Sequence, residues 1–202
     1  MSLNVRLGTS SDRRDIIEFL IVAGNGIFEQ MFEGPLPGLR LRDALRLGVC
    51  EARSPYFIEN AVLVSEEEKN IGCMIGFSGD DYGLPDIVKT VISKKRLAPL
   101  ERLFASKVAN SFYINTLAVH EHAGGRGIAG LLLDVADEMA LEIGAKFLSL
   151  HVWAANEAAF NLYTKRGFEP VEEIIIPQTE YLHHADPMVL MRAPVTEKCL
   201  DQ

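Results

Sequence analysis

Three closely spaced glycines, Gly125, Gly127 and Gly130, lie where an alternating apolar segment gives way to a helical apolar pattern. A glycine-rich bend at the start of a helix lets successive backbone N–H groups point at one spot. The positive end of the helix dipole adds to their attraction for an anion, so a phosphate can be held without a cationic side chain. The sequence therefore predicts a phosphate-binding turn at this point.

The same glycines fit G-x-G-x-x-G, the fingerprint of dinucleotide-binding folds. In those folds the first glycine closely follows the strand, and an acidic residue about twenty positions later holds a ribose hydroxyl. Here the turn from Val119 to Gly125 is longer, and residues 150–153 at the end of the next predicted strand include no carboxylate. A P-loop would require a Lys–Ser/Thr pair after the glycines, which is missing. An oxidoreductase that binds a dinucleotide is therefore only the third choice.

The elements that must position this turn alternate between strand and helix. A strand over Phe112–His120, a helix over Arg126–Gly144 and an apolar strand over Lys146–Ala154 predict a βαβ unit with parallel strands. After this unit we expect a helix over Asn156–Arg166, a strand over Gly167–Ile176, a polar loop and a final strand over Met188–Arg192.

The N-terminal half shows the same alternation. A strand over Asn4–Gly8 is followed by a capping-box pattern at Thr9 and Asp12, which predicts a helix that ends at Gly24–Gly26. The expected elements that follow are a structured loop over 26–38, a helix over Leu39–Ala52, an antiparallel hairpin of Tyr56–Ser65 with Ile71–Ser78, and a helical insertion over 79–110. In this insertion Pro99 is expected to interrupt an apolar face made of Ile87, Val91, Leu97, Leu100, Leu103 and Phe104.

Composition sets further limits on fold and function. With 202 residues, 48% of them hydrophobic, the chain has the size of one domain, which we place at 1–195 with a tail at 196–202. The net charge of −8 argues against nucleic-acid binding. The three cysteines, Cys50, Cys73 and Cys199, have no C-x-x-C spacing, so we expect a reducing, cytoplasmic setting and no zinc site. No apolar run is long enough to span a membrane.

Two separate motifs point to one family. The six positions from Gly124 to Ala129 match the pattern Gln or Arg, two residues, Gly, one residue, then Gly or Ala, except that Gly124 replaces Gln or Arg. A second pattern, N-x-x-A-x-x-L-Y-x-x-x-G-F, is matched by Asn156, Ala159, Leu162, Tyr163, Gly167 and Phe168. Both motifs resemble those of the GCN5-related N-acetyltransferase (GNAT) superfamily, the first being its acyl-CoA pyrophosphate loop. The resemblance is close over residues 112–172.

The resemblance implies an α/β fold with a mixed, mostly antiparallel sheet flanked by helices, in which the fourth and fifth strands splay apart. Acetyl-CoA would lie in that opening, with its pantetheine amides paired to the exposed edge of the fourth strand and its pyrophosphate on the glycine turn. The cofactor-binding residues implied in this way are Leu117, Val119, Gly124, Gly125, Arg126, Gly127, Ile128, Ala129, Gly130, Asn156, Ala159 and Tyr163. No metal is expected.

The resemblance also assigns chemistry. Tyr163 matches the tyrosine that protonates the departing thiolate, which is a general-acid role. Relatives often place a Glu or His base on the fourth strand, whereas the aligned positions here are Tyr113 and Asn115. We expect a water held by these two side chains and by strand carbonyls to take the proton of the amine. His151 and Glu33 are weaker candidates for the base.

The sequence thus predicts an N-acetyltransferase that transfers an acetyl group from acetyl-CoA to a primary amine within a ternary complex. A catalytically degenerate module that binds CoA, or acts in interactions, is the alternative. The acceptor would be a small-molecule or peptide amine, and homodimer formation stays open. Candidate residues for the acceptor site are Phe28, Glu29, Phe32, Glu33 and Tyr181. His183, His184 and Asp186 have a spacing that does not favour a metal site.

Overall fold

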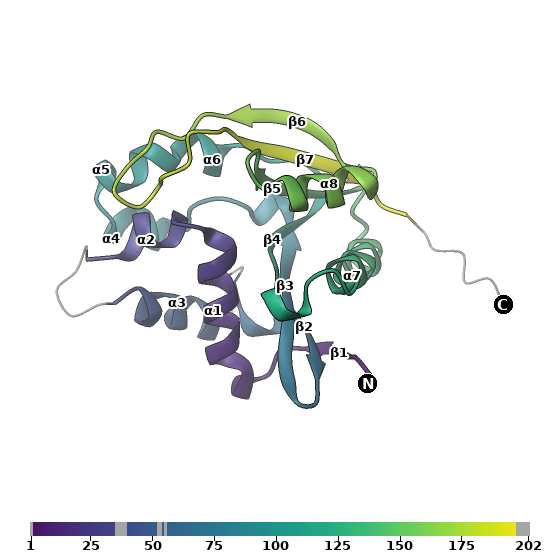
Figure 1. Ribbon diagram of the computed structural model, residues 1–202. Coiled ribbons are helices and arrows are strands. Elements are labelled where there is room, and N and C mark those ends of the chain that lie inside the picture. Colours follow the sequence, from purple (N-terminus) through teal and green to yellow (C-terminus); the bar gives the residue numbers. More distant parts are fainter. Residues whose placement is uncertain (1, 35–39, 52–53, 55, 197–202) are drawn as a thin grey trace.

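The computed structural model describes residues 2–34, 40–51, 54 and 56–196, and these form a seven-stranded sheet with helices on both faces (Figure 1). The strand order is β1-β2-β3-β4-β5-β7-β6. All neighbours are antiparallel except β4 and β5, which are parallel. The strands are β1 Asn4–Leu7, β2 Ala61–Glu66, β3 Lys69–Ser78, β4 Ser111–Val119, β5 Phe147–Trp153, β6 Glu169–Ile174 and β7 Met188–Pro194. The predicted mixed, mostly antiparallel sheet is confirmed.

The helices lie between strands along the chain. The α-helices are α1 Arg13–Gly24, α2 Ile27–Phe32, α3 Leu41–Cys50, α4 Asp86–Val91, α5 Lys94–Leu97, α6 Glu101–Ala105, α7 Ile128–Glu142 and α8 Glu157–Lys165. Short 3₁₀ turns lie at Ser10–Asp12 (η1), Ile58–Asn60 (η2), Gly79–Asp81 (η3), Ala98–Leu100 (η4) and Glu121–Ala123 (η5). The predicted order of elements is confirmed from β1 to β7. The strand predicted over Tyr56–Ser65 begins only at Ala61, after η2, and two further segments differ as described below.

Two apolar clusters lie on opposite faces of the sheet. Ile16 and Leu20 of α1 belong to the cluster that also includes Tyr113 and Trp153. Leu132 and Leu133 of α7 belong to the other. Figure 1 shows α1 and α7 on either side of the strands. The sheet is therefore buried on both faces at its centre, where β4 lies.

Local signals in the sequence explain several boundaries. The Thr9 N–H donates to a carboxylate oxygen of Asp12 over 2.8 Å, which is the predicted capping box at the start of the first helical segment. Asn25 ends α1 in the left-handed conformation, with φ of 44°. The hairpin of β2 and β3 turns at Glu67 and Glu68, whose φ angles of 48° and 66° match a tight two-residue turn.

The prediction of a loop over 26–38 is partly wrong, because helix α2 occupies Ile27–Phe32. Gly26 has a φ of 95° and redirects the chain, so that a new helix begins directly after α1. A Cβ at Gly26 would lie 2.2 Å from the carbonyl oxygen of Tyr181, so only glycine fits there. The prolines that favoured a loop lie outside the described residues.

The prediction of one apolar face along the insertion is also partly wrong. Leu97, Leu100 and Leu103 are buried, but Ile87 and Val91 are 68% and 43% exposed. The reason is that α4 is a separate six-residue helix that ends at Val91, so the helical period does not continue into α5. Pro99 lies in the 3₁₀ turn between α5 and α6, where the break was predicted.

Candidate active site

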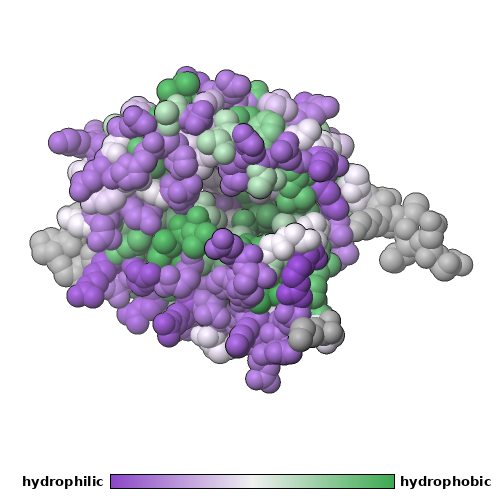
Figure 2. All heavy atoms as spheres, viewed as in Figure 1, coloured by the Kyte–Doolittle hydropathy of each residue, from purple (hydrophilic) through white to green (hydrophobic). Residues whose placement is uncertain are grey.

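Strands β4 and β5 pair over only part of their length. The parallel register joins Ser111–Ile114 to Phe147–Leu150 and stops there, although β4 continues to Val119 and β5 to Trp153. The two strands therefore fork after Ile114 and Leu150. Figure 2 shows that the molecule is hollowed at the centre of this view, with apolar surface on both sides, and Figure 1 places α1 and α7 on either side of that region. The splayed strands implied by the resemblance are present.

Past the fork, the edge of β4 has free backbone groups. The His120 N–H donates to the Ile71 carbonyl over 2.9 Å, so the backbone N–H of His120 faces β3 and not the opening. Successive residues of a strand present their backbone groups to opposite edges. Since Val119 pairs with Gly72 and Leu117 with Met74, both at positions that alternate with His120, the N–H and C=O groups of Leu117 and Val119 face the opening toward β5. Their predicted contact with pantetheine is geometrically accessible.

The glycine turn follows β4 and leads into the fifteen-residue helix α7. Gly125 and Gly127 have φ angles of 73° and 81°, which favour glycine. A Cβ built on Gly125, Gly127 or Gly130 would meet no atom within 4 Å, so open space lies beside the backbone at all three. The first backbone bond inside α7 runs from the N–H of Leu131 to Gly127, which leaves the earlier N–H groups of the helix free for an anion. These residues fit a pyrophosphate.

The other residues of the predicted turn have more restricted roles. Gly124 has an ordinary φ of −60°. The Arg126 guanidinium forms two hydrogen bonds with Glu66, of 3.0 and 2.6 Å, which tie the turn to the end of β2. Ile128 is 2% exposed and packs in the core, so only its backbone is available to a cofactor. Ala129 is half-buried in the first turn of α7.

The second motif forms helix α8 and its N-terminal cap. The Asn156 side chain accepts a hydrogen bond from the N–H of Ala159 over 3.2 Å, which explains the asparagine as a helix cap. Ala159 packs against the cluster on the α7 face. Tyr163 is 6% exposed, its ring lies 5.6 Å from that of Phe168, and burial raises the pKa of its hydroxyl to about 12. Tyr163 therefore keeps its proton across the physiological range. The predicted contacts of these residues with a cofactor stay predictions.

Tyr113 and His151 meet at the fork. The Tyr113 hydroxyl lies 2.9 Å from Nδ1 of His151, the first residue of β5 beyond the last pair with β4. Burial lowers the pKa of His151 to about 3, so its imidazole is neutral. Among the described residues, its Nε2 has no hydrogen-bond partner. Burial also raises the pKa of Tyr113 well above the usual value, and nearby hydroxyls, including that of Tyr163, add to the effect.

Asn115 lies at an irregularity of β4. The register with β3 shifts between Thr116 and Ile114, so Asn115 is the extra residue of a bulge. Its amide donates to the Thr116 hydroxyl over 3.1 Å. Bulges re-aim side chains and often lie beside active sites. The structure therefore brings Tyr113 and His151 together at the fork and places Asn115 two residues further along β4, whereas Glu33 is exposed at the end of α2.

The candidates for the acceptor site divide into two groups. Phe28 and Phe32 line a cavity of about 1690 Å³ between α2, α3, the end of β3 and the insertion. Glu29, Glu33 and Tyr181 do not line it. They lie around Arg96, which donates to the backbone carbonyls of α2 and stacks its guanidinium 5.4 Å from the Tyr181 ring centre. This second group therefore holds α2 against α5 and the 175–187 loop.

Sequence reasoning missed the part played by Tyr82. Its ring lies 4.2 Å from that of Tyr113 and 5.4 Å from that of His151, and its hydroxyl donates to the Leu103 carbonyl over 3.2 Å. Tyr82 thus covers the fork from the insertion. No motif marks it, and its only signal is an aromatic side chain in a segment longer than a connection needs.

The described residues form neither a group of metal ligands nor a helix that could cross a membrane. No three His, Cys, Asp or Glu side chains in that part of the chain are grouped as metal ligands. His184 instead stacks on Trp153, with ring centres 4.2 Å apart. In the same ranges, no helix combines the length and apolarity needed to cross a bilayer.

Comparison with known proteins agrees with this geometry. Residues 28–168 match the model of the acetyltransferase (GNAT) family. The uncharacterised N-acetyltransferase YdgE of Bacillus subtilis is 45% identical over 56 residues, which are 28% of this chain and 36% of that protein. That match therefore spans about a third of the relative's length.

Solved structures extend the likeness of fold to nearly the whole chain. An N-acetyltransferase from Staphylococcus aureus Mu50 has a TM-score of 0.66 and 22% identity over 94% of this chain and 100% of that one. The NatC complex bound to Gag peptide and CoA has a TM-score of 0.56 and 15% identity over 97% of this chain and 100% of that one. The match to the family model covers more than half of the residues. The chain belongs to the acetyltransferase (GNAT) family.

Proposed function

We propose that this protein is an N-acetyltransferase that transfers the acetyl group of acetyl-CoA to a primary amine. The observation that carries the proposal is the fork between β4 and β5, which opens along the same strand that leads into the glycine turn of α7. An elongated ligand with a pyrophosphate at one end and a reactive group at the other fits that arrangement. Membership of the family supports acetyl-CoA as this ligand.

In the proposed complex each part of the chain has a separate task. The N–H groups of Gly125, Gly127 and the first turn of α7 hold the pyrophosphate. The free backbone groups of Leu117 and Val119 pair with the pantetheine amides. Acetyl-CoA supplies the acetyl group as a thioester. Bound in this way, the thioester would lie beside the fork.

The proton transfers are assigned to residues near the fork. Tyr163 gives its proton to the departing sulfur, since its raised pKa keeps it protonated. An amine with a pKa near 10.4, as in lysine, must lose a proton before it attacks. We assign this step to a water held by Tyr113 and Asn115, while His151 fixes the Tyr113 hydroxyl. His151 itself is a poor base because its pKa is lowered to about 3.

A degenerate member of the family that binds CoA without turnover is the second candidate. Two observations favour it: Gly124 lacks the side chain that relatives place there, and β4 has no carboxylate or histidine from Ser111 to Val119. The retained Tyr163 favours the enzyme. Cytoplasmic location, the domain limits and dimer formation stay predictions from the sequence.

The test is to mix the protein with acetyl-CoA and a panel of amines and to measure free thiol. Amine-dependent release of thiol, with the acetylated amine identified by mass spectrometry, supports the enzyme. Binding of acetyl-CoA in calorimetry without thiol release from any amine would favour the degenerate module. A titration with NADH serves as the control for a dinucleotide site and should show no binding.

A further inference from the structure

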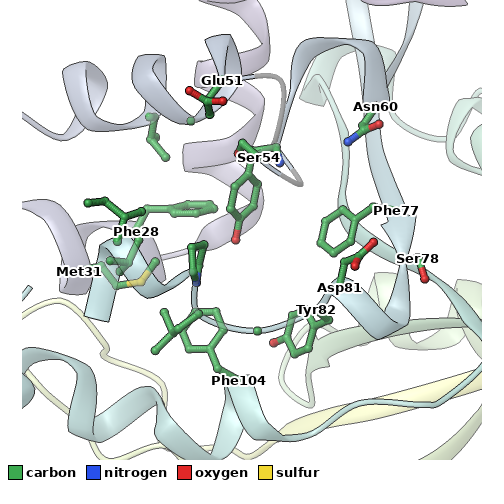
Figure 3. Close-up of a pocket in the computed structure, with 18 of the residues that line it drawn as sticks. Phe28, Met31, Glu51, Ser54, Asn60, Phe77, Ser78, Asp81, Tyr82 and Phe104 are labelled. Atoms are coloured by element: carbon green, nitrogen blue, oxygen red, sulfur yellow. Dashed lines mark hydrogen bonds between the residues drawn. The ribbon is translucent and has the colours of Figure 1, made fainter. Parts of the chain in front are cut away.

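A large cavity lies apart from the glycine turn, and we call it the insertion pocket. It is bounded by α2, α3, the end of β3 and the insertion 79–110 (Figure 3). At about 1690 Å³ it exceeds the roughly 300–1,000 Å³ of most small-molecule pockets. Its wall carries the aromatic rings of Phe28, Tyr56, Phe77, Tyr82 and Phe104. Such a wall suits a bulky apolar ligand.

Several large apolar side chains that line the pocket are exposed to solvent, and we call this exposed part of the lining its mouth. Leu47, Ile87, Val91 and Ile143 all line the pocket and are 63%, 68%, 43% and 53% exposed. Large apolar side chains that gather at one opening mark a binding site more often than chance exposure does. They come from α3, α4 and the end of α7, elements far apart in sequence. The lining of the pocket therefore exposes large apolar side chains from several elements.

Charge at the pocket favours a cation. The carboxylates of Asp81, Glu101 and Glu142 outnumber the ammonium groups of Lys89 and Lys107. Both lysines also have partners, since Lys89 pairs with Asp86 over 3.1 Å and Lys107 donates to the Asp80 carbonyl over 2.9 Å.

Asp81 is the acidic residue best placed to meet a cation. Figure 3 places it beside Phe77 and Ser78 at the wall of the pocket. Its side chain is exposed and makes no hydrogen bond or ion pair with any described residue. An approaching ammonium group would therefore find an unpaired carboxylate at this wall.

Side chains of the pocket wall pack directly against Tyr113 at the fork. Phe77 and Tyr82 line the pocket, and their rings lie 5.6 and 4.2 Å from that of Tyr113. Phe112, near the start of β4, also lines it, whereas the glycine turn follows the far end of the same strand. A ligand in the pocket and a ligand on the glycine turn would therefore lie toward opposite ends of β4, as a ternary complex for direct transfer requires.

We propose that the insertion pocket binds the acceptor, and that the acceptor is a primary amine carried on a bulky apolar or aromatic body. This inference rests on the proposed acetyl transfer. The apolar body lies against the aromatic wall, and the acidic side chains attract the ammonium group before it is deprotonated at the fork. Small polar amines leave the wall uncovered and are poor acceptors.

The experiment compares 2-phenylethylamine and 4-phenylbutylamine with ethanolamine and spermidine in the acetyl-CoA thiol assay. The inference predicts a kcat/KM at least about 100-fold higher for the two aromatic amines. Ile87→Ser at the mouth should raise the KM for 2-phenylethylamine about fivefold, with acetyl-CoA affinity and Tm unchanged. Val22→Ser is the matched control, because Val22 is a 70% exposed apolar residue on helix α1 outside the pocket.

The outcomes separate this inference from the proposed function. Equal or better turnover of ethanolamine or spermidine, with no effect of Ile87→Ser, overturns the acceptor assignment while acetyl transfer stands. If no amine is acetylated, calorimetry with 2-phenylethylamine in the presence of CoA still tests the pocket: binding weakened by Ile87→Ser supports it, and no binding overturns it. Tighter binding of octanoyl-CoA that Ile87→Ser abolishes, or a dimer that Ile87→Ser dissociates, assigns the pocket to another occupant and contradicts the proposal.

Discussion

The hydroxyl of Tyr113 and Nδ1 of His151 are 2.9 Å apart and join β4 to β5 at the point where the two strands separate. This hydrogen bond engages Nδ1 of the imidazole, whereas the buried Nε2 has no partner among the described residues. A buried polar atom without a partner costs about 1–3 kcal/mol. The opening therefore begins where β4 and β5 separate, and a buried polar pair, Tyr113 and His151, lies at that point.

Burial of His151 predicts a specific loss of stability in mild acid. Its pKa falls from 6.5 to about 3 on folding, so below pH 6.5 the unfolded chain binds a proton that the folded chain does not. This contribution to the free energy of unfolding is thus present above pH 6.5 and is lost as the pH falls. Urea unfolding of the wild type and His151→Gln at pH 7 and pH 5 checks it. The variant should lose less stability between the two pH values, and equal losses would contradict the shifted pKa.

Removal of the Tyr163 hydroxyl should reduce turnover and leave binding intact. We expect Tyr163→Phe to lower kcat about 100-fold or more, since that is the usual size of a general-acid contribution. The dissociation constant of acetyl-CoA should stay within about twofold, because the ring and its packing on Phe168 remain. Thiol release and calorimetry measure the two quantities. An unchanged kcat would remove Tyr163 from the mechanism.

The activity of the wild type should not reflect titration of Tyr163 or His151 near neutrality. With pKa values of about 12 and about 3, both groups keep one protonation state from pH 5 to pH 10. The profile of kcat/KM against pH should therefore rise only with deprotonation of the acceptor amine. A second ionisation near pH 6–7, lost in His151→Gln, would instead identify a histidine base.

Gly127 offers a test of the anion-binding turn with an internal control. Gly127→Ala and Gly144→Ala both place a Cβ at positive φ, 81° and 69°, and neither Cβ would meet an atom within 4 Å. Each change should destabilise the fold by about 1 kcal/mol. Only Gly127→Ala puts its methyl group in the space assigned to the pyrophosphate, so it alone should weaken acetyl-CoA binding, by about tenfold or more. Equal affinities of the two variants would place the pyrophosphate elsewhere.

Asp12 should be a main determinant of stability near the N-terminus. Its carboxylate, 5% exposed, accepts hydrogen bonds from Arg6, Thr9 and Asn70, and the Arg6 guanidinium holds its pKa well below the usual value. Asp12→Ala should cost about 2 kcal/mol at pH 7, reduced from the value of a fully buried pair because Arg6 is partly solvated. The contribution is present at neutral pH and is lost as the pH falls below about 4, where the unfolded carboxyl takes up a proton.

The control for Asp12 is the exposed ion pair of Glu18 with Arg42, in which the two side chains are 43% and 64% exposed. Glu18→Ala should change the free energy of unfolding by less than about 1 kcal/mol. Chemical denaturation at pH 7 and pH 3 gives both comparisons. Similar effects of the two substitutions would show that the Asp12 network is no stronger than a surface pair.

Motifs made the C-terminal half predictable, because its function depends on backbone geometry that few residues allow. The positive φ of Gly127 requires glycine, and the cap of α8 requires a side chain such as that of Asn156, so both leave a mark in the sequence. The parallel pairing of β4 with β5 followed from the same stretch.

The acceptor side was less predictable, because aromatic packing leaves no fixed spacing. Tyr82 reaches the fork across the insertion, and Phe77 reaches it from β3, through contacts between distant segments. Helix α2 was missed because its start depends on Gly26. The backbone of Gly26 packs closely against the carbonyl of Tyr181, which is distant in the sequence. The exposure of Ile87 was missed because it depends on where α4 ends.

We propose that the fork, the glycine turn and Tyr163 together perform acetyl transfer. Release of CoA thiol from acetyl-CoA, followed with 2-phenylethylamine as the acceptor and with the product identified by mass spectrometry, tests it most directly. We expect thiol release in step with formation of N-acetyl-2-phenylethylamine, and near loss of both in Tyr163→Phe. Saturable acetyl-CoA binding with no thiol released, for this amine or any other of the panel, would contradict it.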